Sequence, residues 1–244
     1  EDISDQKTTQ KALQKSVHEK NVLLSEIHHR VRNNLALISA FFELQIMYSR
    51  YEGIAAIQKV QKRIKCLSLV HEAYAADGQS AYVNAGKYLK QLIKFVYKTE
   101  GSQHARLKIT HNLPAFRLNI NQAVPAGLLC NELLLYLISE YAGEASGEHC
   151  TIHFDLQQSG DELCLQISNT LQNMGLKYEL EADEKLEMMI VKTLASQLNG
   201  TIKVKQEKRL LIFELSFKKR NVKGPSSSMP DFKSDLLGQS PKMI

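Results

Sequence analysis

A long stretch near the start of the chain carries a heptad pattern that no Pro or Gly interrupts. Within residues 8–50, mainly apolar residues recur at the a and d positions through which helices pack together. The a positions are Val17, Leu24, Val31, Ile38 and Gln45, and the d positions are Leu13, Lys20, Ile27, Asn34, Phe41 and Tyr48. After His29 the apolar stripe widens onto the flanking e and g positions. The pattern predicts one long helix that enters a four-helix bundle, with a single long surface helix as the alternative.

A second apolar periodicity runs from about residue 54 to 75, directly after a short Tyr51–Gly53 turn segment. Two helices joined by so short a turn are typical of an antiparallel hairpin. One hairpin by itself would leave a wide apolar stripe exposed to water. We therefore expect two copies of the chain to associate as a homodimer that completes the four-helix bundle.

Downstream, the chain changes to short strands separated by apolar helices. Asn84 predicts the N-cap of a third helix that reaches about Lys98. Strands are expected at residues 106–111, 150–157, 162–169, 201–206 and 210–217, and helices at 122–141 and 184–198. Strands grouped with helices on one face predict an α/β sandwich, so the fold class is α+β. The expected parts are a helical domain (1–99), the sandwich (100–219) and a flexible tail (220–244) rich in Gly, Pro and Ser.

Composition narrows the possible functions. Apolar residues make up 43% and charged residues 23%, which is ordinary for a globular protein. The formal charge is +5, but residues 218–244 hold six Lys or Arg and two Asp, against 25 basic and 24 acidic residues elsewhere. The basic excess therefore lies in the tail, which argues against nucleic acid as a partner. No run of 18 apolar residues occurs, so we expect no direct membrane contact and a cytoplasmic location.

The four cysteines are widely spaced, and they show no metal-ligand pattern with any histidine. Cys66, Cys130, Cys150 and Cys164 form no C-x-x-C pair. Buried free thiols in a reducing compartment are the expected state. We predict no metal site.

The segment around residues 28–34 contains the candidate reactive side chains of the sequence. By the heptad, His28 lies at e and His29 at f, where both imidazoles face solvent, and Arg30 and Asn34 share a face one turn apart. A neutral imidazole nitrogen can attack phosphorus while guanidinium and amide groups hold the phosphoryl oxygens. The alternative is a pair of solvated histidines on a charged helix surface.

The sequence His29-Arg30-Val31-Arg32-Asn33 closely resembles the phosphoacceptor helix of bacterial histidine kinases of the H-R-x-x-N subgroup. The likeness continues through Arg63–Glu72, which is similar to the second bundle helix, and Asn121–Leu133, which is similar to the start of the ATP-binding domain. It covers about residues 15–218. The resemblance implies that His29 accepts the phosphoryl group, assisted by Arg30, Arg32 and Asn33.

The second half departs from the family at three nucleotide-binding motifs. Glu132 of the N-box is kept, but Tyr136 replaces the magnesium-binding Asn and Ser139 replaces a basic residue. Ser168 stands at the position of the adenine-binding Asp, and Glu187 at a lid Gly. A phenol is a poor Mg²⁺ ligand, and a glutamate repels a triphosphate. We therefore expect ATP binding to be lost, so that these degenerate positions hold no cofactor.

A kept phosphoacceptor beside a lost ATP site predicts a histidine phosphotransfer protein of a two-component phosphorelay. It would pass phosphoryl between His29 and an aspartate of a response-regulator receiver domain. Two alternatives stay open at this point. One is an active but atypical ATP-dependent histidine kinase, and the other is a pseudokinase scaffold that transfers no phosphoryl group.

Overall fold

The structure, a computed structural model, describes residues 10, 13–16, 38, 53–76, 82–143, 149–170, 186–207 and 210–220. Nearly all of the heptad segment and all of the tail after residue 220 lie outside these residues. The hairpin, the four-helix bundle and the homodimer therefore stay predictions. Ile38, at a predicted a position, is helical and packs half-buried against the core.

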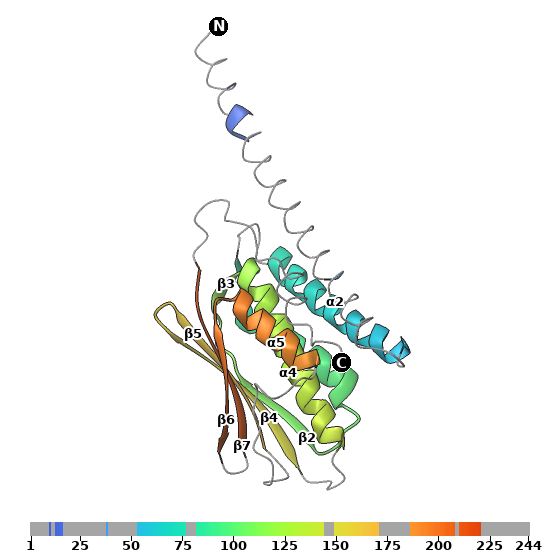
Figure 1. Ribbon diagram of the computed structural model, residues 1–244. Helices are drawn as coiled ribbons and strands as arrows, with labels where there is room; N and C mark the ends of the chain where they lie inside the picture. Colours follow the sequence, from blue (N-terminus) through green and yellow to red (C-terminus); the bar gives the residue numbers. More distant parts are fainter. Residues whose placement is uncertain are drawn as a thin grey trace, which may run out of the picture.

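A five-stranded sheet forms one layer of the protein (Figure 1). In spatial order its strands are β2 (Leu107–Asn112), β4 (Cys150–Ser159), β5 (Glu162–Thr170), β7 (Leu210–Lys218) and β6 (Thr201–Glu207). β2 runs parallel to β4, and every other neighbouring pair is antiparallel. Gly160 turns the chain between β4 and β5 with a φ of 60°, a conformation that glycine adopts without strain. All five strands were predicted from the sequence, with bounds within two residues.

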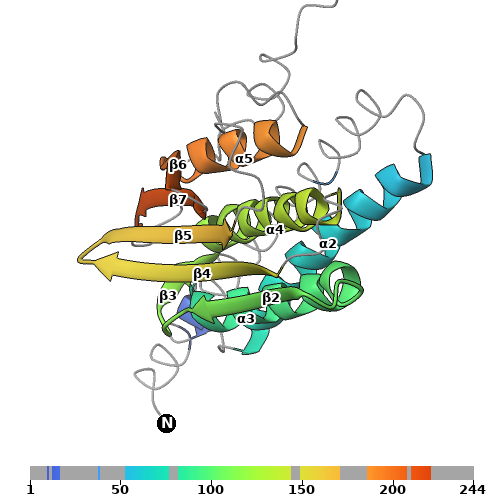
Figure 2. The same ribbon diagram turned by 90° about the horizontal axis from the view of Figure 1, so that it is seen from below.

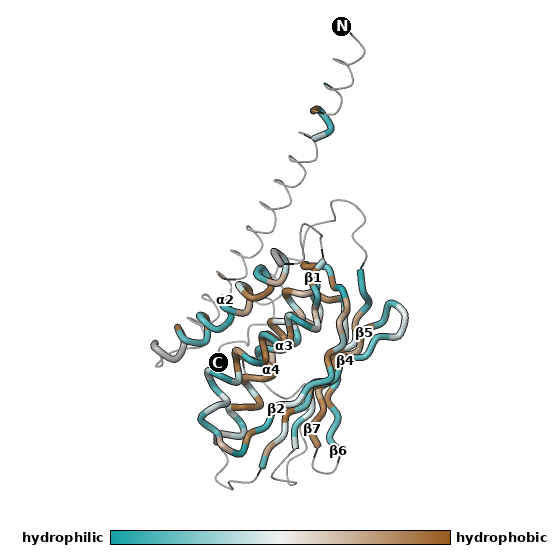
Figure 3. Tube along the Cα trace, turned by 180° about the vertical axis from the view of Figure 1, so that it is seen from behind, coloured by the Kyte–Doolittle hydropathy of each residue, from teal (hydrophilic) through white to brown (hydrophobic). Residues whose placement is uncertain are grey.

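Helices cover one face of this sheet, as Figures 1 and 2 show. The helices are α3 (Ala85–Val96), α4 (Ile120–Gly143) and α5 (Leu186–Gln197), and α2 (Gly53–Ala76) packs on α3 and α4. Along the strands, hydrophobic and hydrophilic residues alternate (Figure 3), and the hydrophobic ones face the helices. This arrangement confirms the predicted α+β class with helices on one face of the sheet.

Two helix ends follow the local signals in the sequence. The Asn84 side chain accepts a hydrogen bond of 3.0 Å from the backbone N–H of Lys87, which caps α3 as predicted. After α5 the chain reaches Asn199, whose φ of 50° ends the helix, and Gly200 follows. Both boundaries are set by short-range chemistry that the sequence displays.

Short elements between these helices and strands were not predicted. β1 (Tyr82–Asn84) pairs antiparallel with β3 (Arg117–Asn119), and a π-helix, η1 (Tyr97–Gly101), extends α3. Three-residue strands carry too few residues to show an alternation. The β1–β3 ladder joins β1 to the half of the chain that carries the sheet, and α3 is joined to the same half by its packing on α4. The expected division near residue 99 groups them with the hairpin, and it stays a prediction.

One continuous hydrophobic core joins α2, α3, α4, α5 and the sheet. Among the described residues, one helix, Ile120–Tyr141, is long and apolar enough to span a membrane by length and composition. However, 89% of an 18-residue apolar stretch of this helix is buried inside the protein, which is typical of a core helix.

The cysteines are free, as expected. Cys66, Cys130 and Cys150 are buried, and Cys164 is half-buried. Burial raises the pKa of Cys66 to about 12. Its thiol is therefore protonated and serves packing rather than chemistry.

Candidate functional site

The predicted phosphoacceptor group lies outside the described residues. The roles of His29, Arg30, Arg32 and Asn33 therefore stay predictions that rest on the motif and its resemblance. The structure does describe the five positions named above in the nucleotide-binding motifs, where Glu132 is kept and the other four residues depart from the family. These lie on α4, β5 and α5.

Glu132 of the N-box is bound to an arginine of α2. Its two carboxylate oxygens accept hydrogen bonds from Arg63, at 3.0 Å from Nε and 2.7 Å from Nη2. Asn131 Nδ2 donates to the same carboxylate at 3.0 Å. Both charged side chains are only 2% exposed. The N-box carboxylate is therefore used inside the protein, in a two-pronged ion pair that joins α2 to α4.

Burial and the partner charge have opposite effects on this pair. Burial favours a neutral arginine, but the adjacent Glu132 carboxylate raises the pKa of Arg63 above its ordinary value. A buried charge without a partner is strongly destabilising, so each of the two side chains requires the other. The pair therefore fixes which face of α2 packs on α4.

Tyr136, one helical turn further along α4, is directed into the core. It is 5% exposed, and its ring meets that of Phe213 edge to face, with centroids 6.4 Å apart and planes at 82°. Ser139 is exposed on the next turn, and its hydroxyl donates to the Tyr136 carbonyl at 2.8 Å. Neither residue provides the amide oxygen or the cation expected of the N-box in the resembling family.

Glu187, in the first turn of α5, is held by a second cation of α2. Its carboxylate accepts a hydrogen bond of 3.0 Å from Lys59 Nζ. Burial opposes ionisation of Glu187, but a backbone hydrogen bond at the helix start and Lys59 together lower its pKa. Where a helix N-terminus could attract a phosphate, a carboxylate of the protein is already bound.

Ser168 and its neighbour Asn169, near the end of β5, lie on opposite faces of the sheet. Ser168 lies on the sheet face away from the helices, whereas Asn169 lies on the helix-covered face with Ile167 and is 7% exposed. Among the described residues, none donates a hydrogen bond to the buried Asn169 Oδ1. The two-residue period of β5 could have revealed this, since Ile167 and Asn169 must share a face.

At the end of the site where the triphosphate would lie, the residues present do not fit magnesium-ATP. Glu132 and Glu187 are engaged by α2, and Tyr136 fills space against Phe213. The end of β5 differs from this, because the Asn169 carboxamide there can still accept a hydrogen bond. The residues present therefore support no chemical step on a bound nucleotide.

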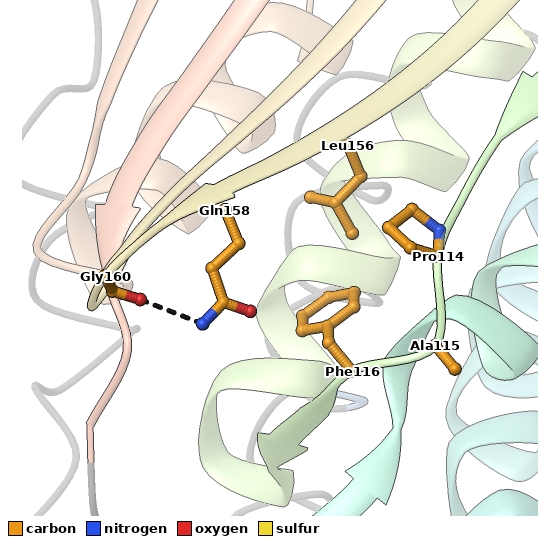
Figure 4. Close-up of a pocket in the computed structure, with 6 residues that line it drawn as sticks. All are labelled: Pro114, Ala115, Phe116, Leu156, Gln158 and Gly160. Atoms are coloured by element: carbon orange, nitrogen blue, oxygen red, sulfur yellow. Dashed lines mark hydrogen bonds between the residues drawn. The ribbon is translucent and has the colours of Figure 1, made fainter.

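A separate hollow lies between residues 114–116, which precede β3, and the end of β4 at the Gly160 turn, and it carries no catalytic group (Figure 4). It has a volume of about 420 Å³ and is lined by Pro114, Ala115, Phe116, Leu156, Gln158 and Gly160. The Gln158 amide donates to the Gly160 carbonyl at 2.8 Å. None of these six side chains is ionisable, so the hollow supplies no acid, base or nucleophile.

The Lys59–Glu187 pair predicts a pH dependence of stability. The pKa of Glu187 is lowered in the folded state, so its contribution is complete above the unfolded value near 4.3 and is lost as the pH falls through the lower folded value. The Glu187→Gln variant should be about 1 kcal/mol less stable than wild type at pH 7, and this difference should shrink below pH 4. Urea unfolding of both proteins at pH 7, 5, 4 and 3 measures it.

Taking the difference in stability between the wild type and Glu187→Gln at each pH cancels the titration of the other carboxylates. Glu72 and Glu214 also have lowered pKa values, through Lys65 and Lys205 respectively. They lose their contributions over the same acid range in both proteins. A difference that stays constant from pH 7 to 3 would contradict the assignment to Glu187.

Comparison with known proteins agrees with the motif. Residues 26–100 match the HisKA_2 histidine kinase family. The sensor histidine kinase PdtaS of Mycolicibacterium smegmatis is 25% identical over 186 residues, which cover 75% of this chain and 36% of the relative. PdtaS of Mycobacterium tuberculosis is 24% identical over 185 residues. The chain thus spans little more than a third of the length of these relatives.

Solved structures agree on the fold. The histidine kinase domain of the Erythrobacter litoralis EL346 blue-light activated histidine kinase has a TM-score of 0.58 at 14% identity, covering 82% of this chain and 97% of that one. A longer structure of the same kinase has a TM-score of 0.57 at 18% identity, covering 80% and 62%. At these identities the likeness concerns the fold, which is a helical region followed by an ATPase-like sheet.

The family match, the sequence relatives and the fold define a class. Residues 26–100 match a histidine kinase family, and the chain is similar in sequence to sensor histidine kinases and in fold to a histidine kinase domain. The resemblance that His29-Arg30-Val31-Arg32-Asn33 indicated is therefore confirmed at the level of the family.

Proposed function

We propose that this protein is a histidine phosphotransfer protein that exchanges phosphoryl groups with a receiver domain and does not use ATP. The proposal rests on one observation above the others: α2 supplies the cations that bind Glu132 and Glu187, where the family's nucleotide phosphates would need access. The buried ring of Tyr136 supports the same conclusion, since a phenol at this position supplies no magnesium ligand.

The chemistry needs only His29 and a phosphorylated partner. A neutral ring nitrogen of His29 attacks the phosphorus of an aspartyl phosphate on the receiver. The bond between phosphorus and the aspartate oxygen breaks, and the carboxylate leaves as an anion. The N–P bond of a phosphohistidine forms at the same time, and the reverse step returns the phosphoryl group. Arg30, Arg32 and Asn33 would hold the phosphoryl oxygens during transfer.

The partners follow from the class and the motif. A response-regulator receiver domain would donate or accept the phosphoryl group, and it would bring its own divalent cation. We further propose that two copies of the chain form the four-helix bundle, and that the protein acts in the cytoplasm. The predicted exposure of His29 at heptad position f suits docking by another protein.

A nucleotide titration tests the loss of ATP binding. We expect no heat change and no thermal shift when the full chain is titrated with Mg-ATP up to about 1 mM, a limit that corresponds to less than about 4 kcal/mol of binding free energy. Incubation with radiolabelled ATP and Mg²⁺ should leave the chain unlabelled. Micromolar affinity with labelling would contradict the proposal and favour the atypical kinase, for which the Asn169 carboxamide would provide an adenine contact.

Phosphotransfer itself is tested without ATP. Receiver domains charged with acetyl phosphate and freed of excess reagent are mixed with the full chain, and acid-labile label on the chain is followed. The expected result is rapid transfer from at least one receiver of the same organism. If neither nucleotide labelling nor transfer from any of them occurs, the chain is a scaffold and the proposal is wrong.

A further inference from the structure

A stripe of four lysines runs along the exposed face of α3 and η1. Lys87, Lys90, Lys94 and Lys98 follow one another at intervals of three or four residues, so their side chains share one face of the helix. All four residues are exposed. The chain contains no Asp or Glu between residues 82 and 99, so the stripe carries no interspersed negative charge.

This arrangement is unfavourable for α3 itself. Lys87 lies in the first turn, where the helix dipole repels a cation, and like charges one turn apart repel each other. None of the four lysines forms an ion pair with another described residue. Elsewhere the protein does pair its lysines across elements, as Lys62 does with Glu100 at 2.7 Å. The local fold therefore does not account for the stripe.

The stripe borders an apolar hollow at the edge of the sheet. The hollow lies between α3 and β2 and has a volume of about 480 Å³. Its apolar floor includes Ile93, Leu107 and Ile109. Its basic rim includes Lys90, Lys94 and Lys108. β2 forms one edge of the five-stranded sheet and pairs within it with β4. We call this combination of hollow, lysines and edge strand the basic groove.

We propose that the basic groove binds an acidic, extended segment of a partner protein, which adds to the sheet as a strand beside β2. An edge strand offers backbone groups for pairing with another chain. In an added strand, alternate side chains point to opposite faces, so one set would enter the hollow beside Lys90 and Lys94 of α3. An acidic segment would place carboxylates in that set, next to the lysines that border the apolar floor. The charge of the groove selects such a segment over neutral or basic ones.

The shape of the groove favours a peptide over other anions. A membrane surface is flat, and the proteins that lie on it present a broad apolar face with aromatic anchors. Single-stranded nucleic acid requires successive aromatic rings for base stacking. The hollow instead is concave, and its lining has two aromatic rings, those of Tyr97 and His111, which lie on different elements. The hollow lies beside the edge strand β2, and an extended chain is the form of ligand that can pair with such an edge.

The test uses the full chain and a fluorescein-labelled peptide of eight residues in which Glu and Val alternate. We expect saturable binding by fluorescence anisotropy that weakens with salt, and at least tenfold weaker binding of the same peptide with Gln in place of Glu. The variant K90Q/K94Q should lose about tenfold in affinity. The control K203Q/K219Q removes the same charge outside the groove and should change affinity by less than about twofold.

Backbone amide shifts identify the binding mode. Along β2, the backbone groups of Lys108 and Thr110 face β4, and those of Ile109 and His111 face the sheet edge. In ¹H–¹⁵N spectra, the peptide should therefore shift the amides of Ile109 and His111 more than those of β6 at the opposite edge. Equal losses in the two double variants, or shifts spread evenly over the surface, would overturn the proposal. So would tighter binding to vesicles with 30% phosphatidylglycerol or to a labelled oligothymidine than to the acidic peptide.

Discussion

Replacing Arg63 by Met should lower the free energy of unfolding by about 3 to 5 kcal/mol. The change leaves Glu132 buried with one remaining hydrogen bond, from Asn131, and without a cation. Because the carboxylate is only 2% exposed, water cannot replace the lost guanidinium. Urea unfolding followed by circular dichroism, extrapolated linearly to water, measures the loss.

A double variant separates the ion pair from the fold. Arg63→Met combined with Glu132→Leu removes both charges and keeps apolar volume, so its stability should return to near the wild-type value. Lys65→Met provides the matched control on the same helix, because Lys65 pairs with Glu72 in solvent, and it should cause no measurable change. If Arg63→Met were as harmless as Lys65→Met, α2 would not be docked on α4 in solution.

Replacing His29 by Gln should abolish phosphotransfer from a charged receiver, with a fall in rate of at least about 100-fold. Glutamine keeps a polar side chain at a position that the heptad predicts to be exposed, but its amide nitrogen is not a nucleophile. The fold should persist, so the circular dichroism spectrum and the urea midpoint should match the wild type. The measurement is the initial rate of acid-labile labelling of the chain.

The neighbouring histidine supplies the control for this experiment. His28→Gln should retain transfer within about threefold, because the motif aligns His29 and not His28 with the phosphoacceptor. Loss of labelling in His28→Gln with retention in His29→Gln would move the site by one residue. Equal labelling in both variants and the wild type would show that neither histidine is phosphorylated.

The two experiments address separate parts of the protein. Arg63 and Glu132 join α2 to the ATPase-like half, whereas His29 is the residue proposed to transfer phosphoryl. A phosphotransfer protein without ATP has no need for a nucleotide face that opens and closes. Cations of α2 can then bind Glu132 and Glu187 without interfering with the proposed reaction. The buried Arg63–Glu132 pair can hold α2 on α4, because no nucleotide has to reach this surface.

The elements with strong local signals could be predicted from the sequence. The five strands of the sheet, the N-cap at Asn84 and the end of α5 near Asn199 depend on neighbours a few residues away. Their physical causes are side-chain alternation, capping and backbone conformation, which a single sequence displays. The family of the His29 motif was also evident from the sequence, because its residue types and spacing are specific.

The tertiary structure decided what depends on distant partners. The β1–β3 ladder joins residues about 35 apart, and Arg63 and Glu132 meet across 69 positions, so neither leaves a local pattern. The sequence marked Glu132 as a remnant of a motif, and only packing turned it into half of a buried ion pair. Likewise, the lysines of α3 became the rim of a groove only once β2 lay beside them. Local periodicity fixes what each segment forms, but the partner of a buried charge is set by which segments the shared core brings together.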